Sequence, residues 1–179
     1  MGEALLESFQ IYGWKPDEDL SDDDNFVELL LLVTRCSKLQ QGSMGCILVR
    51  PPRSPQEPLL NRIQSVANNQ EFYKPNSSDI HAEVAAIGQA AQQARSTAHC
   101  TAYITIPPCR KCFASLYAAG VRRIVTGLRP PEMFARFGDV EILQGRDMDE
   151  RRRRVQLLVE ENQDTVQETE EGSTVVEET

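Results

Sequence analysis

The stretch that decides the fold is TAYITIPPCRKCFASLYAAGVRRIVTG, residues 101–127. Residues 101–106 are rich in β-branched and aromatic side chains, which predicts a strand. Residues 109–119 are predicted to form a helix closed by Gly120, because glycine readily adopts the left-handed conformation that follows many last helical turns. Residues 121–127 form the next predicted strand. This alternation of strand and helix indicates an α/β layered domain with right-handed crossovers.

The segments on either side continue the alternation. Apolar residues between positions 25 and 39 recur at helical spacing, whereas residues 44–50 form an apolar run typical of a strand buried on both faces. The following strand is expected to pair with this one as a hairpin. The sequence thus predicts helices over residues 25–39, 81–95, 131–137 and 147–161, and further strands over residues 44–50, 62–68 and 140–144.

Composition places the chain among single-domain globular proteins. It has 179 residues, of which 40% are hydrophobic and 26% charged, enough to bury a core without disulfides. No apolar run approaches the ~20 residues of a membrane span, and the first ten residues lack the positive charge of a targeting signal. We therefore expect a cytoplasmic or nuclear protein without a membrane partner. Residues 26–161 form the predicted domain, between an acidic flexible lead (1–25) and an acidic disordered tail (162–179). The aromatic residues Phe9, Tyr12 and Trp14 of the lead are candidates for docking onto the domain.

The net charge of −8 is unevenly distributed along the chain. Residues 1–25 carry eight acidic residues and one lysine, and residues 160–179 carry eight acidic residues and no basic one. Residues 26–159 hold 18 basic and 11 acidic residues, a charge of +7. A positive centre suits an anionic ligand such as a nucleotide or a nucleic-acid strand. The alternative is a solvated surface with two solubilising ends.

The cysteines indicate metal chemistry rather than disulfides. There are five, an odd number without a preceding secretion signal, and Cys109 and Cys112 form a C-x-x-C pair. Both lie at the start of a predicted helix, where positions i and i+3 project to one side and the helix dipole favours the thiolate. His81 precedes another predicted helix. Together the three residues supply three ligands to a tetrahedral Zn²⁺ and leave the fourth position for water.

Glu83 follows His81 by two residues and indicates a catalytic site. It is close enough to touch a zinc-bound water without ligating the metal, and zinc lowers the pKa of such a water to about 7. A carboxylate at this place can then move the proton. The alternative is a closed four-ligand site that also uses Cys100 or His99, but such a site leaves Glu83 without a role.

The order His-x-Glu, then Pro-Cys-x-x-Cys after 24 intervening residues, resembles the signature of zinc nucleobase deaminases. The resemblance to the cytidine and deoxycytidylate deaminase superfamily covers residues 26–161. The chain looks most like the deoxycytidylate type in four segments, residues 35–37, 44–49, 80–83 and 118–121. The resemblance implies a cytidine deaminase-like three-layer α/β/α fold with a five-stranded mixed sheet. It also implies a proton-shuttling Glu83 and a zinc ion held by His81, Cys109 and Cys112.

The same resemblance implies a set of substrate contacts. Asn69 matches a family asparagine that contacts the substrate, with Asn68 as the alternative in this register. The backbone N–H of Ala82 is expected to meet the base carbonyl. The loop after Asn69 supplies the residues expected to stack on the base, Phe72 and Tyr73, and those expected to hold a phosphate, Lys74 and Ser77.

The expected activity is hydrolytic deamination of a cytosine nucleotide or nucleoside, of the dCMP, CMP or cytidine type, with release of ammonia. One alternative is a tRNA adenosine or single-strand polynucleotide deaminase, or the catalytic subunit of one. Against it, Pro107 stands where the tRNA enzymes usually have glutamate. Another alternative is a zinc-bearing regulatory module without turnover. The expected partners are a small nucleotide or nucleoside, RNA or single-stranded nucleic acid, and further subunits of a homo- or hetero-oligomer.

Overall fold

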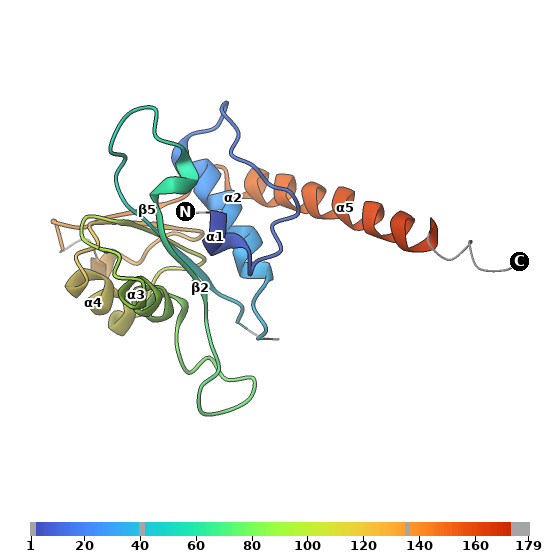
Figure 1. Ribbon diagram of the computed structural model, residues 1–179. Coiled ribbons are helices and arrows are strands. Elements are labelled where there is room, and N and C mark those ends of the chain that lie inside the picture. Colours follow the sequence, from blue (N-terminus) through green and yellow to red (C-terminus); the bar gives the residue numbers. More distant parts are fainter. Residues whose placement is uncertain (1–2, 40–41, 135–136, 173–179) are drawn as a thin grey trace, which may run out of the picture.

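A five-stranded mixed sheet forms the centre of the computed structural model, which describes residues 3–39, 42–134 and 137–172 (Figure 1). Its strands are β1 (Gly45–Val49), β2 (Ile63–Asn68), β3 (Thr101–Ile104), β4 (Arg123–Thr126) and β5 (Glu141–Gln144). They lie in the order β2-β1-β3-β4-β5. β1 is antiparallel to both of its neighbours, whereas β3, β4 and β5 run parallel. The predicted mixed sheet and the predicted β1–β2 hairpin are both confirmed.

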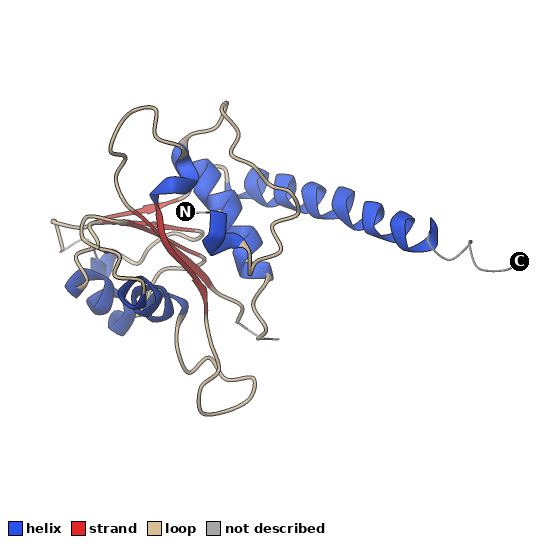
Figure 2. Ribbon diagram, in the orientation of Figure 1, coloured by secondary structure: helices blue, strands red, loops and turns tan. Residues whose placement is uncertain are grey.

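Helices cover both faces of the sheet, which confirms the predicted three-layer α/β/α fold (Figure 2). One layer consists of α3 (Ala82–Gln92) and α4 (Arg110–Ala118). The other contains α1 (Glu3–Leu6), α2 (Asp22–Arg35) and the beginning of α5 (Met148–Gly172), whose far end extends away from the domain (Figure 1). Two 3-10 turns, η1 (Leu59–Arg62) and η2 (Glu132–Phe134), lie in connecting segments. Every described helix is too short or too polar to cross a membrane.

β1 is the central strand of the hydrophobic core. All five of its residues are buried, as the continuous apolar run predicted. Because side chains alternate along a strand, Ile47 and Val49 join the core under α2, while Cys46 and Leu48 join the core under α3 and α4. The sheet is thus packed on both faces, so a ligand site is expected at the ends of its strands rather than on a face.

Most helix and strand positions agree with the sequence prediction, but several ends differ. α2 begins at Asp22 because the Ser21 hydroxyl caps it, accepting a hydrogen bond from the Asp24 N–H at 3.2 Å. α5 continues to Gly172, well beyond the predicted end at residue 161. The helix predicted over residues 131–137 is only the η2 turn, and residues 135–136 lie outside the described part. Gly120 has φ +84°, so the predicted left-handed cap of α4 is confirmed.

The lead segment, predicted to be flexible, packs along α2 and α5. Leu5, Leu6 and Trp14 are buried in the same core as α2. The Asp17 carboxylate pairs with Arg154 of α5 at 2.7 Å. These contacts hold the lead against the domain. The burial of Trp14, and the packing of Phe9 and Tyr12 against the same core, agree with the expected docking of these aromatic residues. Residues 173–179 of the predicted disordered tail lie outside the described residues, so disorder there stays a prediction.

Candidate metal and catalytic site

The predicted zinc ligands all lie at helix N-termini on the same face of the sheet. His81 is the N-cap residue of α3, and Cys109 is the N-cap residue of α4. Cys112 follows in the first turn of α4, and its N–H donates to the Cys109 sulfur at 3.4 Å. The two helices are neighbours in one layer, so the fold brings together residues that are 28 and 31 positions apart. Their positive N-terminal ends favour negative charge at this place.

The three ligand atoms are spaced as a zinc site requires. His81 Nδ1 lies 3.4 Å from Cys112 Sγ and 3.9 Å from Cys109 Sγ, and all three atoms lie within 4.8 Å of one another. Around a tetrahedral ion with Zn–S near 2.3 Å and Zn–N near 2.0 Å, ligand atoms are about 3.5–3.8 Å apart. The two distances from His81 Nδ1 lie within a few tenths of an ångström of these values, and closing the site around the ion requires shifts of at most about 1 Å. Two thiols and an imidazole form a donor set that zinc prefers.

The electrostatics of the site also favour a bound cation. Burial raises the pKa of the Cys112 thiol, and the nearby Glu83 and Cys109 raise it further. Burial also raises the pKa of Cys46, again with contributions from Glu83 and Cys112. Glu83 itself is only 6% exposed. A carboxylate buried beside thiols is unfavourable unless positive charge compensates it, and a divalent metal supplies that charge.

A cavity of about 280 Å³ opens beside these residues. Glu83, His81 and Cys109 form its reactive wall. The remaining walls are mostly apolar and come from the start of β1, the end of β3 and the loops around them; the lining residues there are Gly42, Met44, Asn69, Ser78, Ile104, Ile106 and Pro107. The arrangement places one buried carboxylate and two of the three metal ligands at a small, mostly apolar pocket.

Of the two candidate asparagines, Asn69 lines the cavity and Asn68 does not. Asn68 instead uses its amide N–H groups to bind the carbonyls of Val33 and Met44, at 2.8 and 3.0 Å. Asn69 is 5% exposed and follows the end of β2. Ala82, the other predicted contact, is fully buried as the first residue of α3, so its N–H has no partner one helical turn earlier.

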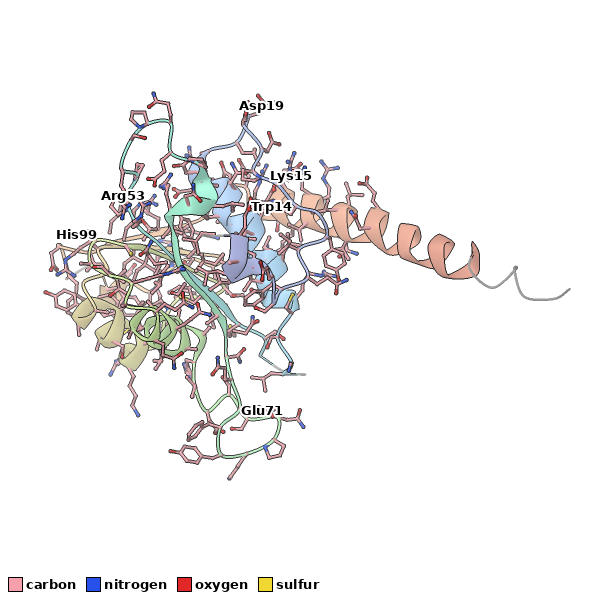
Figure 3. The ribbon with its side chains drawn as sticks, in the orientation of Figure 1. Trp14, Lys15, Asp19, Arg53, Glu71 and His99 are labelled. Carbon is pink, nitrogen blue, oxygen red and sulfur yellow. The ribbon has the colours of Figure 1, made fainter. Side chains whose placement is uncertain are left out.

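The predicted stacking and phosphate residues are not at the cavity. Phe72 and Tyr73 are 68% and 82% exposed, and neither they nor Lys74 lines it. The reason is Asp79, whose carboxylate accepts the backbone N–H groups of Phe72, Tyr73 and Lys74 at 2.7–3.1 Å. These bonds lower the pKa of Asp79 and curl the loop on itself. Figure 3 shows Glu71 on this loop, which extends away from the sheet and helices.

A comparison with known families supports this site. A family model described as the cytidine and deoxycytidylate deaminase zinc-binding region matches residues 20–128, more than half of the chain. The chain belongs to this family. The protein is therefore a zinc-binding nucleobase deaminase, and His81, Cys109 and Cys112 are arranged to hold the metal.

Solved structures of other deaminases share the fold. The dCMP deaminase of cyanophage S-TIM5 is 19% identical with TM-score 0.55, over 68% of this chain and 95% of that one. A guanine deaminase from Nitrosomonas europaea is 17% identical with TM-score 0.57, over 89% and 92%. A structure from a study of tRNA:A34 deaminases is 21% identical with TM-score 0.50, over 72% and 96%. At sequence identities this low, the similarity shows a shared fold only. The similar structures include deaminases that act on several classes of substrate.

A longer relative matches over only part of its length. The deaminase/reductase from Thermotoga maritima is 20% identical with TM-score 0.55, and the match covers 74% of this chain but 38% of that one. No curated protein sequence matches the chain.

The geometry of this deaminase argues against a closed four-ligand site. Among the described residues, the group of candidate metal ligands contains only His81, Cys109 and Cys112. Cys100 lies just before β3, whereas the site lies beyond the other end of that strand. Burial raises the pKa of Cys100 to about 11, and its sulfur contacts the Ser96 carbonyl at 3.7 Å. It is a buried core thiol.

Sequence reasoning missed most of the cavity wall. The sequence pattern assigns three apolar residues of the wall to strands, namely Met44, Ile104 and Ile106. An apolar side chain at a strand position gives no indication of whether it faces the core or a ligand. Ser78 was missed for another reason: it lies three residues before His81 in a polar loop, and only the fold brings it beside Asn69.

Proposed function

We propose that the protein is a zinc-dependent hydrolase that converts a cytosine nucleotide or nucleoside to the uracil product and ammonia. The observation that carries the proposal is the position of Glu83, a buried carboxylate in the same cavity as the metal ligands His81 and Cys109. A structural zinc site needs no such acid, whereas hydrolysis of a C–N bond does.

The chain's own residues supply the proton transfers. In the net reaction one water replaces the exocyclic amine, forming a C=O bond and releasing NH₃. Zinc, when bound, acts as a Lewis acid that makes water acidic near neutral pH. The Glu83 carboxylate accepts a proton from the attacking water and returns it to the leaving amine. Ala82 offers its free backbone N–H next to Glu83, where it can hold the base carbonyl.

The cavity supports a small, flat substrate. Its volume of about 280 Å³ lies below the roughly 300–1,000 Å³ of typical drug-sized sites. Ile104, Ile106 and Met44 form apolar walls that suit the faces of a single pyrimidine ring. Arg110 and Lys111 are exposed at the start of α4, next to Cys109, and place positive charge near the entrance. These features favour a cytosine ring that carries an anionic group.

One observation favours a polynucleotide substrate as the second candidate. Phe72 and Tyr73 form an edge-to-face pair with centroids 4.8 Å apart, on a loop that Asp79 holds in shape. Exposed aromatic side chains can stack on the bases of a single strand. This loop leads directly into His81, so a strand with its target base in the cavity could lie along it.

The two candidates are separated by ammonia release from a panel of substrates. Zinc-loaded protein is incubated with dCMP, CMP, cytidine, deoxycytidine, cytosine, adenosine, guanine, a short single strand and a tRNA. We expect turnover of dCMP or CMP, with a shallow dependence of kcat/KM on salt because one phosphate is involved. Inert cytosine monomers combined with turnover of a strand, and a steep salt dependence, would support the second candidate instead.

A further inference from the structure

The side-chain amide of Asn69 is completely engaged by the protein. Its Oδ1 accepts the Met44 N–H at 3.0 Å and the Ser37 hydroxyl at 3.1 Å. Its Nδ2 donates to the Gly42 carbonyl at 2.9 Å and to Ser78 Oγ at 3.0 Å. An amide has two acceptor and two donor positions, so all four are used. Asn69 therefore has no free group for a substrate in this conformation.

The two backbone partners fix which way the amide faces. The Met44 N–H can only donate and the Gly42 carbonyl can only accept, so oxygen and nitrogen of the Asn69 amide cannot be exchanged. The direction of both hydroxyl bonds follows. Ser37 must donate its proton to Asn69, and Ser78 must accept a proton from it. The proton of the Ser78 hydroxyl therefore points away from Asn69 and can be donated to another acceptor.

Ser78 lines the cavity and is exposed. Within the described part of the chain, its hydroxyl proton has no protein acceptor. It is thus a donor that a hydrogen bond from Asn69 holds in one orientation at the entrance, while Glu83 lies buried deeper in the same cavity. A base that reaches Glu83 leaves its sugar and phosphate on the exposed side, where Ser78 lies.

We propose that Ser78 is a substrate-binding residue, which donates a hydrogen bond to an acceptor oxygen of the sugar or phosphate, and that Asn69 orients it. This deepens the proposed function: it predicts that the enzyme acts on a nucleoside or nucleotide rather than on a free base. The role given to Asn69 is then indirect, because it holds the donor instead of touching the substrate.

The test compares Ser78→Ala and Ser78→Thr with Ser77→Ala as the matched control. Ser77 is in the same loop, but its hydroxyl donates to Asp79 at 2.8 Å and it does not line the cavity. Steady-state kinetics are measured with deoxycytidine and dCMP, and free cytosine is measured as a substrate or competitive inhibitor. We expect Ser78→Ala to raise KM for deoxycytidine or dCMP roughly three- to tenfold, the effect of one lost neutral hydrogen bond. Cytosine binding and kcat should change little, Ser78→Thr should restore KM, and Ser77→Ala should resemble wild type.

The substrate series also identifies the oxygen that is bound. An equal loss for deoxycytidine and dCMP assigns the contact to the sugar, and a loss for dCMP alone assigns it to the phosphate. Weaker binding of cytosine to the same degree would overturn the proposal, because it would show that Ser78 only supports the pocket.

Failure of the proposed function gives a different pattern. If wild type deaminates another base, the same comparison is made with the free base, nucleoside and nucleotide of that base. If wild type turns over none of these compounds, binding of dCMP and cytosine to the zinc-loaded protein replaces kinetics. An enzyme that accepts only free bases would contradict the role of Ser78 even if it is a deaminase.

Discussion

At the scale of single residues, the site places a carboxylate and thiols close together in a buried position, where their negative charge is unfavourable unless a cation is bound. Cys112 and Glu83 are both buried, and burial together with the nearby Glu83 raises the pKa of the Cys112 thiol. The N-termini of α3 and α4 offset part of this cost, since each helix end carries a partial positive charge. A zinc ion offsets the rest. Binding of the metal should therefore stabilise the fold as well as prepare the chemistry.

We expect one zinc per chain, held by three protein ligands. Cys112→Ser should lose the metal, because a hydroxyl is a poor substitute for a thiolate ligand. Cys100→Ser is the matched control, as it makes the same change in another buried cysteine, and it should keep one zinc. Metal analysis of the purified variants measures both. Loss of zinc in Cys100→Ser would favour a closed four-ligand site.

At the scale of elements, α2 and α5 are joined by a buried ionic network around Glu28. Its carboxylate accepts hydrogen bonds from Arg151 at 2.8 Å and Arg154 at 2.7 Å, and from the Trp14 indole N–H at 3.4 Å. The side chains of Glu28 and Arg151 are only 4% and 9% exposed. The network connects the lead segment, α2 and α5 behind the sheet.

Removing Glu28 should destabilise the protein strongly. Glu28→Ala leaves the Arg151 guanidinium buried without its counter-ion, which costs about 3 kcal/mol or more of unfolding free energy. Asp149→Ala is the control, because its pair with Arg152 lies on the surface and is worth about 0.5 kcal/mol or less. Urea unfolding of both variants provides the comparison. Similar unfolding free energies for the two would show that the network contributes little.

Helices, strands and site residues could be predicted from the sequence where neighbouring residues determine them, but not where distant contacts do. The strand–helix–strand unit and the zinc ligands were readable because periodicity, a capping glycine and ligand spacing all act locally. The aromatic residues of the lead indicated that it could dock onto the domain, but its ion pair with α5 could not be predicted, since Asp17 and Arg154 are 137 positions apart. The prediction that Phe72 and Tyr73 stack on the base was wrong for the loop as it is folded here. The Asp79 carboxylate accepts hydrogen bonds from the backbone N–H groups of this loop, and both aromatic side chains are exposed.

At the scale of the whole molecule, the fold partly cancels the charge separation along the chain. Acidic residues of the first 25 pair with basic residues of the centre, as Asp22 does with Arg62 and Asp23 with Arg123. The far end of α5 extends away from the domain on the side opposite α3 and α4, which form the site (Figure 2). The described part of α5 thus lies across the sheet from the helices that form the site.

Deleting residues 163–179 should consequently have little effect on catalysis. At 0.15 M salt the Debye length is about 8 Å, less than the roughly 10 Å between packed layers, so kcat/KM for an anionic substrate should stay within about twofold. Kinetics of the truncated and full chains over a range of salt test this. A several-fold rise in kcat/KM at 0.15 M salt would mean that the acidic end reaches the site.

The most direct measurement of the central claim compares Glu83→Gln with wild type in zinc content, melting temperature and ammonia release. The amide keeps the size of the side chain but cannot accept and return a proton. We predict one zinc per chain and an ordered fold in both proteins, with kcat/KM of the variant at least about 100-fold lower. A folded, zinc-loaded Glu83→Gln protein that releases ammonia at the wild-type rate would contradict the account.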